Sequence, residues 1–326
     1  MAIGGAVYYL SKNRSEPYLE LTNDTSDTAQ STILPQPTNQ STTTPLPTIR
    51  ETITTTPSSG DFSIEDTIPK LNGSVKISDE NFMFNPTEVN TLRPDIFNPG
   101  YFSIFDILAY LEKQGSIDLE YHFDNSMNTH IIDSMNGESD WWYRIYYDGG
   151  WPEDNVFRPD NYPWKDGATL TFFNVDRSYL EEIYSIFENE VNRRKNNEDK
   201  LIIPNVIING RTFNKEFKNV EVTPHNVRYD IFKRDLTTAV DVILSLADQG
   251  KINYELKWYE SIGTARMVNS YWVEAIDVDK HHDRCGFVYE AGSLKYKGFR
   301  GNHIHLPTDV RILNSPNYVE FFWICI

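Results

Sequence analysis

The chain of 326 residues has the length of two domains of ordinary size with an additional tail. Hydrophobic residues make up 39% of it and aromatic residues 13%, which is enough to build hydrophobic cores. The formal net charge of −17 at pH 7 argues against nucleic acids and anionic membrane surfaces as partners, because phosphate groups attract basic surfaces. Such acidity is typical of a soluble protein.

Residues 1–14 contain a short apolar run that is followed directly by Lys12 and Arg14. The run is too short to span a lipid bilayer. It resembles the last turns of a transmembrane helix or of an uncleaved signal, so we interpret 1–14 as the remnant of a membrane anchor or signal segment. An N-terminus without fixed structure is the alternative interpretation.

Residues 15–61 are rich in Thr, Ser and Pro and nearly lack large apolar side chains. Such a segment cannot bury enough surface to offset the entropy of ordering it, so we expect a disordered, extended stalk. Acceptor sequences for N-glycosylation begin at Asn23 and Asn39 in the stalk and at Asn72 beyond it. Together these features favour an extracellular, cell-surface glycoprotein that is membrane-anchored at its N-terminus.

The stretch 103–123 predicts a helix, a stop and a strand. Ser103 and Asp106 have the spacing of a capping box at the start of the helix. Gly115 is placed to adopt the left-handed conformation that ends the helix. Side chains then alternate along the strand, and we expect four of them to point toward the core: Ile117, Leu119, Tyr121 and Phe123.

The same pattern returns 135 residues later, where Thr238 and Asp241 replace the cap and Gly250 replaces the stop. The register holds without a gap, and the matches include Ile68-Pro69 with Ile203-Pro204, Phe82 with Phe217, and Arg93-x-Asp95-Ile96-Phe97 with Arg228-x-Asp230-Ile231-Phe232. We therefore predict a tandem repeat of one α+β domain, each copy a mixed sheet packed on one helix. The copies are 62–175 and 201–326, and 176–200 is expected to be a connecting helix.

The densest aromatic passage of the chain begins at residue 140. Flat amphipathic rings can stack on a planar or saccharide ligand, so six side chains are candidates for ligand binding: Trp141, Trp142, Tyr143, Tyr147, Trp151 and Trp164. Alternation along a strand requires about half of such residues to face the core. Core packing is therefore the competing interpretation, and Trp141 and Trp151 are the members that we expect to be exposed.

The second copy departs from the first in its later part. Matching 283–292 to 140–149 places Tyr289 opposite Tyr146 and loses the tryptophan pair of the first copy. A further match pairs Phe299-Arg300 with Phe157-Arg158, and the closing strand of the second copy is expected at 318–324.

Two cysteines and a group of histidines lie in this divergent part. Cys285 and Cys325 can form one disulfide or remain two buried thiols. Four of the seven histidines are His281, His282, His303 and His305. A His-x-His pair on a strand places both imidazoles on one face, which a metal ion can use. The alternative is solvent-facing histidines in a long hairpin, and the first copy has no counterpart.

The first copy carries a resemblance to a known family. Its helix, glycine and strand are followed by Trp-Trp-Tyr-x-x-x-Tyr-Asp-Gly at 141–149 and by Tyr-Pro-Trp-Lys-Asp-Gly at 162–167. This order resembles the C-terminal β-domain family of transcobalamin and intrinsic factor, and it reaches the second copy through the internal repeat. The resemblance implies two tandem β-grasp (ubiquitin-like) domains. In the vitamin carriers this domain closes over a corrinoid against a helical barrel, which nothing in this sequence provides.

Familiar catalytic motifs are absent from the sequence, among them a Gly-rich phosphate loop, Gly-x-Ser-x-Gly, His-Glu-x-x-His and Cys-x-x-Cys. We therefore expect a noncatalytic cell-surface binding or adhesion protein without a cofactor, whose partner is a surface protein, a glycan or a small ligand. One alternative is capture of a small ligand, a corrinoid or another planar cofactor. A further alternative is a self-assembling surface-layer or filament subunit, in which the strand at 319–326 pairs with a neighbour.

Overall fold

The computed structural model describes residues 67–147, 153–154, 157–261, 267–294 and 306–325. The predicted anchor remnant 1–14 and the predicted stalk 15–61 lie outside these residues, as do Asn23 and Asn39. The described chain is α+β, with three α-helices and mixed and antiparallel sheets. None of these helices is long and apolar enough to cross a membrane. Asn72 is exposed, as an acceptor for a glycan must be.

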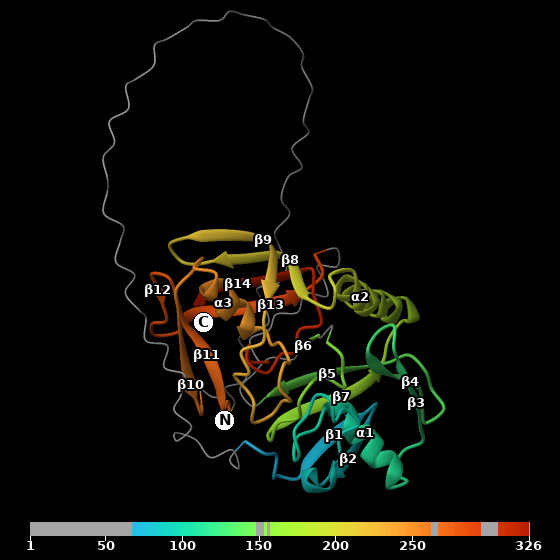
Figure 1. Cartoon of the computed structure of the whole chain (residues 1–326). Coiled ribbons are helices and arrows are strands. Elements are labelled where there is room, and N and C mark those ends of the chain that lie inside the picture. The colour runs from blue at the N-terminus through green and yellow to red at the C-terminus, as the bar shows by residue number, and fades with distance from the viewer. Residues whose placement is uncertain (1–66, 148–152, 155–156, 262–266, 295–305, 326) are drawn as a thin grey trace, which may run out of the picture. The chain divides into compact units, whose positions relative to one another are not determined.

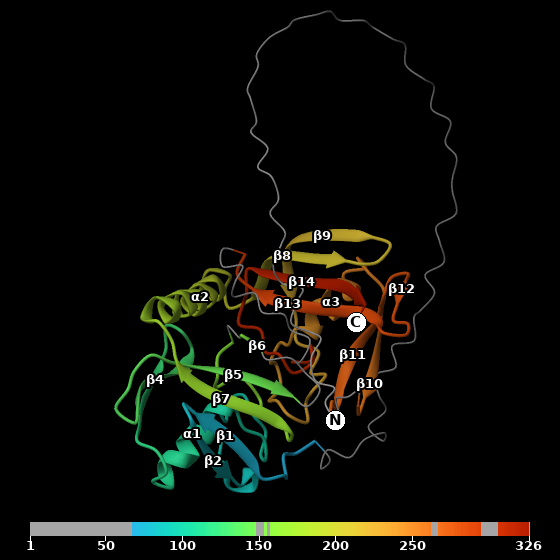
Figure 2. The same cartoon turned by 180° about the vertical axis from the view of Figure 1, so that it is seen from behind.

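The first repeat is built on a sheet with the strand order β2-β1-β7-β5-β6. Its strands are β1 (Gly73–Ile77), β2 (Glu80–Phe84), β5 (Trp141–Tyr147), β6 (Glu153–Asp154) and β7 (Ala168–Asn174), and a short 3₁₀ helix, η2 (Pro86–Glu88), follows β2. β1 runs parallel to β7, and the other pairs are antiparallel. The sheet is therefore mixed, with the first strand beside the last long one (Figures 1 and 2).

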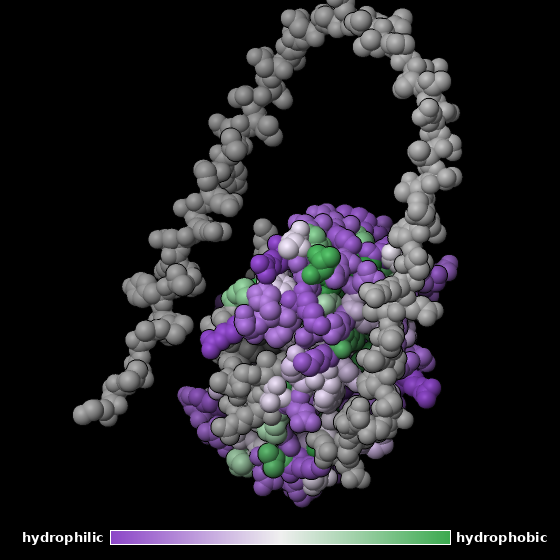
Figure 3. Space-filling model, turned by 90° about the vertical axis from the view of Figure 1, so that its left-hand side faces the viewer, coloured by the Kyte–Doolittle hydropathy of each residue, from purple (hydrophilic) through white to green (hydrophobic). Residues whose placement is uncertain are grey.

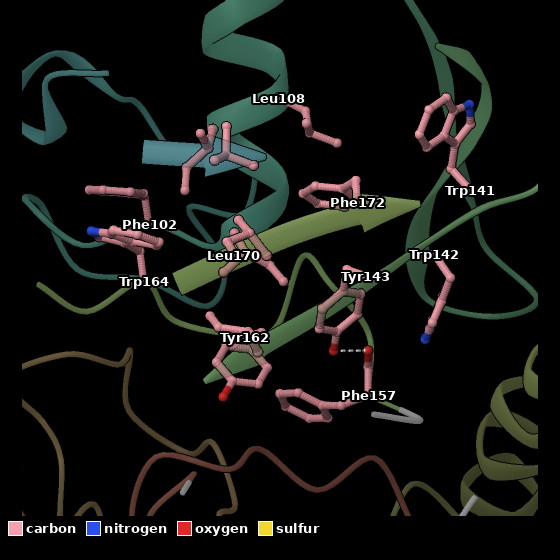
Figure 4. Packing of buried hydrophobic residues seen from close by; sticks show 14 of the residues in the cluster. Phe102, Leu108, Trp141, Trp142, Tyr143, Phe157, Tyr162, Trp164, Leu170 and Phe172 are labelled. Atoms are coloured by element: carbon pink, nitrogen blue, oxygen red, sulfur yellow. Dashed lines mark hydrogen bonds between the residues drawn. The ribbon is translucent and has the colours of Figure 1, made fainter. Parts of the chain in front are cut away.

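Helix α1 (Ile104–Lys113) packs on one face of this sheet. Both halves of the predicted capping box are present, because Ser103 Oγ accepts from the Asp106 amide and Asp106 Oδ2 accepts from the Ser103 amide at 2.6 Å. Gly115 ends the helix in the predicted left-handed conformation, with φ +70°. The apolar side chains of α1 join the core, and Figure 4 shows Leu108 pointing toward β7.

The strand predicted after α1 is β3 (Leu119–Asp124), which pairs with β4 (Thr129–Met135) in a two-stranded ribbon. The exposed fractions of Tyr121 and Phe123 on this strand are 36% and 38%. The prediction that both side chains face the core is therefore wrong. A two-stranded ribbon has no further strands beside it to extend the cover over one face. Both rings contact His130, at centroid distances of 5.8 and 5.0 Å, Tyr121 also meets the edge of Phe105 at 5.3 Å, and the Arg93 guanidinium lies 5.3 Å from the Phe123 centroid, which leaves each ring partly exposed.

The second repeat has the same strand order in its sheet, β13-β14-β8-β9, with β8 parallel to β14. Its elements are β8 (Leu201–Asn209), β9 (Asn214–Val222), α3 (Val240–Asp248), β10 (Tyr254–Tyr259), β11 (Ser270–Ile276), β12 (Asp279–Lys280), β13 (Cys285–Gly292) and β14 (Tyr318–Cys325). Strands β10, β11 and β12 form a separate ribbon. At the start of α3, Asp241 Oδ2 accepts from the Thr238 amide at 2.6 Å, and Gly250 follows the helix with φ +67°.

Strand pairing corrects the alignment of the late part of the two repeats. Tyr143 on β5 lies opposite Phe172 of β7, and Tyr289 on β13 lies opposite Phe321 of β14. Because both pairs occupy the same place in their sheets, Tyr289 is the counterpart of Tyr143, and the predicted match with Tyr146 is wrong. Several aromatic residues in a row allow such a slip in a sequence alignment.

A tether from the same tyrosine supports the corrected alignment. The Tyr143 hydroxyl donates a hydrogen bond of 2.6 Å to the main-chain carbonyl of Phe157, and the Tyr289 hydroxyl donates one of 2.6 Å to that of Leu306. Each bond holds the loop that precedes the last strand of its repeat. Residue 306 therefore corresponds to residue 157, whereas residues 299–300, which the sequence matched to 157–158, lie outside the described residues.

The first hairpin also differs in length between the repeats. Val75 lies opposite Phe82, seven positions on, whereas Val206 lies opposite Phe217, eleven positions on. The hairpin of the second repeat is thus four residues longer. The predicted gapless register therefore fails before Phe217, and the sequence match at Ile203-Pro204 is not a structural one.

Strand β14, predicted at 318–324, lies inside its sheet and pairs with β13 on one side and with β8 on the other. From Tyr318 to Phe322 the strand is paired on both sides, so these residues have no free edge for a neighbour. Trp323 to Cys325 pair with β13 alone and Ile326 lies outside the described residues, so self-association through the end of this strand stays a prediction.

The segment 176–200 contains the helix α2 (Arg177–Asn196). Its buried apolar side chains belong to the core of the first repeat: Leu180, Ile183, Ile186 and Phe187. Arg158 of the first repeat binds this helix through an ion pair of 2.5 Å with Glu190 and a hydrogen bond of 3.1 Å to the Phe187 carbonyl. The connecting segment therefore packs on the first repeat.

Replacing Tyr143 with Phe leaves the Phe157 carbonyl buried without its donor. We expect the free energy of unfolding to fall by about 1–2 kcal/mol, measured by urea denaturation. Tyr289→Phe should have a similar effect, because it removes the same contact from the second repeat. Tyr146→Phe is the matched control and should change stability by less than about 0.5 kcal/mol. Equal stability of all three variants would rule out the tethers as a stabilising contact.

Candidate functional site

Four of the predicted ligand-binding aromatic residues lie in the core of the first repeat (Figure 4). Their exposed fractions are 3% for Trp141, 4% for Trp142, 0% for Tyr143 and 4% for Trp164. The expectation of an exposed Trp141 is wrong, because its ring is packed in the core and its Nε1 donates to the Glu138 carbonyl at 2.8 Å. Trp151 and the side chain of Tyr147 lie outside the described residues.

The histidines that suggested a metal site are only partly described. His281 Nδ1 lies 3.8 Å from a Glu274 carboxylate oxygen, and His282 Nε2 lies 3.0 Å from Arg211 Nη1. Within the described ranges, no group of three or more His, Cys, Asp or Glu side chains could hold a metal ion. The other predicted ligands, His303 and His305, lie outside those ranges.

Cys285 and Cys325 form a disulfide in the structure. They are the first residue of β13 and the last residue of β14, and they lie opposite each other in the strand pairing. The bond therefore closes the free end of this pair of strands.

The two repeats contact each other through the Ile-Phe part of the motif that the sequence repeats. Asn98 N donates to Ile231 O at 2.9 Å, and Lys233 N donates to Ile96 O at 2.8 Å. Because the same positions are exchanged between the two bonds, the contact has the reciprocity of a two-fold axis. The rings of the intervening phenylalanines, one from each repeat, have centroids 5.7 Å apart.

The Arg-x-Asp part of the motif forms an ion cluster around a buried arginine in each repeat, with Asp95 exposed in the first repeat and Asp230 buried in the second. In the first repeat, Arg93 binds Asp95 and Asp160 at 2.8 and 2.9 Å. Asp160 also accepts from Thr129 Oγ1 at 2.6 Å and from the His130 amide at 2.9 Å. The cluster therefore attaches the β3–β4 ribbon to the loop that precedes β7.

The second repeat has the same cluster. Arg228 binds Asp230 at 2.8 Å and Asp309 at 3.1 Å. Asp309 accepts from the Tyr271 amide at 2.8 Å, which attaches the β10–β11 ribbon in the same way. The ring of Trp258 lies below the guanidinium, with its centroid 5.4 Å from Arg228 Cζ.

The two buried carboxylates differ in their proton affinity. Burial raises the pKa of Asp160, but hydrogen bonds from His130, Arg93 and Thr129 outweigh burial, and the net pKa is lowered. Burial also raises the pKa of Asp309, and there the charge of its arginine partner does not outweigh it, so the net pKa is raised. The Asp309 carboxylate of the second cluster therefore takes up a proton at a higher pH than the Asp160 carboxylate of the first.

A cleft between the repeats opens beside the second cluster. Its space is about 580 Å³, including the part that is continuous with solvent. The lining includes Tyr101, Trp164, Lys165 and Asp166 from the first repeat and Arg228 and Val268 from the second. Among the aromatic candidates whose side chains the structure describes, Trp164 lines this cleft.

The loop that carries Trp164, Lys165 and Asp166 is fixed on both sides. Asp166 Oδ2 accepts from the Lys70 and Leu71 amides at 2.8 and 3.1 Å. Gly167 follows with φ +80°, and a Cβ atom there would lie 3.0 Å from the Met267 methyl group. A glycine is therefore required where the loop passes the other repeat.

Lys165 crosses from one repeat to the other, and its Nζ donates to the main-chain carbonyl of Val268. Burial and the charge of Arg228 lower the pKa of Lys165, the charge of Asp309 raises it, and the net pKa is about 7. At neutral pH about half of the Lys165 amines are therefore uncharged. A lysine in this state can accept a proton when an anion approaches it.

The sequence pattern indicated only Trp164 among the residues of this cleft. Lys165 and Asp166 belong to the passage at 162–167 that carries the family resemblance, and Arg228 belongs to the repeated motif. An arginine followed by an aspartate and two large apolar residues in both copies is a signal for a buried ion pair. No local pattern places Lys165 beside Arg228, because they belong to different repeats.

No protein-family model, no curated protein and no solved structure matches this chain. Its function is therefore proposed from its own residues and from the contacts that they make.

Replacing Arg228 with Met leaves two buried carboxylates without their cation. We expect the free energy of unfolding to fall by about 3–5 kcal/mol, measured by urea denaturation. Adding Asp309→Asn to this variant should restore part of the loss, because it removes one of the stranded charges. The control is Arg234→Met at an exposed position, which should have little effect. If Arg228→Met and the double variant with Asp309→Asn have the same free energy of unfolding, the loss in Arg228→Met does not come from the stranded Asp309 carboxylate.

Lys165 should make stability depend on pH. Its pKa is about 7 in the folded protein and 10.5 in a free side chain, so between these values the unfolded chain holds a proton that the folded chain lacks. Raising the pH through this window therefore stabilises the fold. Lys165→Met should stabilise more at pH 6 than at pH 9, by a difference of about 1–2 kcal/mol.

The matched control for this variant is Lys113→Met, at an exposed lysine in the last turn of α1. Its effect on the free energy of unfolding should be the same at both pH values. A difference for Lys165→Met that is no larger than that for Lys113→Met would show that the Lys165 amine titrates normally.

Proposed function

We propose that this chain is a noncatalytic extracellular binding or adhesion protein that displays two β-grasp domains on a stalk at the cell surface. The observation that supports this best is the set of contacts that the two repeats share. These are the helix cap, the buried ion cluster and the tyrosine tether, and each of them holds the scaffold. The two copies share these scaffold contacts but differ in the loops and ribbons around them. Such a pair of scaffolds can present two different surfaces to partners.

The β-grasp assignment is supported by the order of elements within each repeat. A hairpin comes first, a helix follows, and the first strand lies parallel to the last long one in the middle of a mixed sheet. The proposed kinship with the transcobalamin and intrinsic factor domain rests on the passages at 141–149 and 162–167. The described part of the first passage lies largely in the core, so these residues serve the fold first.

A surface protein or a glycan is the proposed partner for this binding role. Figure 3 shows a face on which hydrophilic residues predominate and hydrophobic residues form small, separate patches. With the net charge of −17, such a surface favours contacts through hydrogen bonds and ion pairs. The membrane anchor and the stalk, both outside the described residues, belong to the same proposal.

The test is retention of beads coated with the full chain on arrays of glycans and of purified surface proteins. We expect saturable retention on a subset of spots, and free full chain should compete it away. Beads coated with the heat-unfolded chain are the control. Turnover of glycoside, ester or peptide substrates by the purified chain would contradict the noncatalytic assignment.

A second function, capture of a small ligand, is favoured by the cleft between the repeats. There an aromatic ring, a lysine and a carboxylate converge, and such a combination orients small molecules in many proteins. A corrinoid or another planar cofactor is the ligand that the family resemblance suggests. Trp164 lines the cleft, so a bound chromophore should quench its fluorescence.

The corresponding test is a fluorescence titration of the full chain with cyanocobalamin, corrected for inner-filter absorption and repeated by calorimetry. Saturable quenching that is reduced in Trp164→Phe would support capture of a corrinoid in this cleft. The control variant is Trp323→Phe on β14, which should retain the same binding isotherm. Absence of saturation in both measurements would remove the corrinoid from the proposal.

A further inference from the structure

Two insertions that the first repeat lacks meet at one end of the second repeat. The first is the longer turn of the β8–β9 hairpin, at 210–213. The second precedes β13: Tyr289 lies thirteen positions after the end of β11, whereas its counterpart Tyr143 lies eight positions after the end of β4. The hairpin turn and β12 lie side by side in both views (Figures 1 and 2). We call the segments 210–213 and 280–286 together the tip of the second repeat.

Hydrogen bonds hold the two insertions to each other. The Asp279 carboxylate of β12 accepts from the Thr212 amide at 2.9 Å and from the Thr212 hydroxyl at 2.7 Å. Arg211, the neighbour of Thr212, donates from Nη1 to His282 Nε2 at 3.0 Å, since a guanidinium has donors only. The Arg211 side chain is therefore held in one place although it is exposed.

The turn that carries His282 is fastened to the end of the sheet. The main chains of His282 and Cys285 exchange two hydrogen bonds, of 3.1 and 2.8 Å. The disulfide joins Cys285 to Cys325 at the end of β14. The half-buried ring of Trp323 lies beside the turn, with its centroid 5.7 Å from that of the His282 ring. The tip therefore holds an arginine, a histidine and a tryptophan next to one another.

The tip carries cations that no carboxylate neutralises. Arg211 and Arg284 are exposed, and within the described residues neither forms an ion pair. The partner of Arg211 is a nitrogen of His282, which brings no negative charge. One acidic residue, Asp283, belongs to the tip. In a chain whose acidic residues outnumber its basic residues by 47 to 30, this local reversal of charge favours an anionic partner.

We propose that the tip of the second repeat binds an acidic polysaccharide, with its carboxylate or sulfate groups at Arg211 and Arg284 and a sugar ring against Trp323. Guanidinium groups bind such oxyanions through paired N–H donors. The flat amphipathic ring of a tryptophan offers a surface to a sugar, and this favours a saccharide over an acidic peptide. The inference rests on the proposed binding function and names the class of glycan and its site.

The first repeat has a different arrangement at the corresponding place. The shorter turn between β1 and β2 carries Asp79, which pairs with Lys76 at 3.2 Å. The link between β4 and β5 lacks the insertion that supplies the histidine and the second arginine. Binding should therefore depend on the second repeat.

The experiment measures binding of the full chain to immobilised polygalacturonate, dextran sulfate, unmodified dextran and poly-L-glutamate by biolayer interferometry. We expect saturable binding to polygalacturonate, which carries carboxylates, or to dextran sulfate, and none to dextran. Raising the NaCl concentration from about 50 to about 300 mM should weaken binding about tenfold, because salt screens exposed charges. Poly-L-glutamate, which is acidic but has no sugar ring, should bind at least about tenfold more weakly.

Charge variants locate the site. Arg211→Gln and Arg284→Gln should each weaken binding about tenfold. Arg234→Gln, at an exposed arginine outside the tip, is the matched control and should bind like the unchanged chain. Asp283→Asn removes the acidic residue of the tip and should strengthen binding about threefold, a gain that a misfolded variant could not produce. Circular dichroism verifies that every variant is folded.

A ring variant tests the contact with the sugar. Trp323→Phe keeps both arginines and offers a smaller ring, so it should weaken binding to the polysaccharide about threefold or more and leave the weak binding of poly-L-glutamate unchanged. An equal effect on both polymers, or on neither, would overturn the contact between the sugar and this ring.

The outcomes separate this inference from the function beneath it. Binding that both arginine variants leave unchanged would place the polysaccharide elsewhere and overturn the site. Poly-L-glutamate that binds as tightly as the polysaccharides would overturn the class of ligand. If neither acidic polysaccharide binds while the arrays of glycans and surface proteins retain the chain, this inference is wrong and the proposed binding function stands. If nothing is retained in either experiment, both are wrong.

Discussion

Each repeat depends on an arginine that is removed from water and must be neutralised inside the protein. The exposed fractions of Arg93 and Arg228 are 4% and 3%, and those of Asp160 and Asp309 are 0%. Burying a charge costs several kcal/mol, so each arginine is tolerated only where its carboxylates reach it. Each buried aspartate lies in the loop before the last strand and also accepts from the ribbon. One charge requirement therefore brings ribbon, loop and sheet together.

The same requirement also positions the contact between the repeats. In both copies an isoleucine and a phenylalanine follow the Arg-x-Asp segment directly, so fixing the arginine fixes the main chain of these two residues. Their carbonyl and amide groups then pair reciprocally across the two-fold contact. The core of the first repeat continues through Ile231 and Phe232 into residues 306–312. A motif of five residues thus supplies both the polar centre of each repeat and the apolar contact between them.

Those parts of the structure that depend on neighbouring residues could be predicted from the sequence. The helix caps and the glycine stops follow from side chains within a few positions. Both glycine stops and the full capping box of the first copy occur as expected, whereas the second copy keeps the bond from the Thr238 amide to Asp241 but has no side-chain cap on α3. The exposure of Tyr121 and Phe123 could not be predicted, because alternation defines two faces of a strand but not what covers them. The cleft could not be predicted either, since Lys165 and Arg228 meet only when the repeats associate.

The register of the late strands failed for a related reason. Trp141, Trp142 and Tyr143 offer several aromatic positions to an alignment, and the insertions in the second copy remove any fixed offset. The buried tyrosine is identified by its tether to a loop carbonyl, and that partner is distant in sequence. A sequence match weighs every aromatic residue alike, whereas the fold distinguishes the one whose hydroxyl must find an acceptor.

Beside the cleft, the two repeats differ in the cation that reaches one loop carbonyl. In the first repeat, the Met127 carbonyl accepts from Arg158 Nε at 2.8 Å, and Glu190 of the connecting helix holds that arginine. The tyrosine tethers and the strand pairing place Pro307 at the position of Arg158 and Val268 at that of Met127.

Proline has no side-chain donor for this carbonyl, and Lys165 of the first repeat donates to it instead. In the first repeat, the corresponding arginine is held by Glu190 of α2. Lys165 lines the cleft together with Arg228, so the cation at this position of the second repeat comes from the other copy.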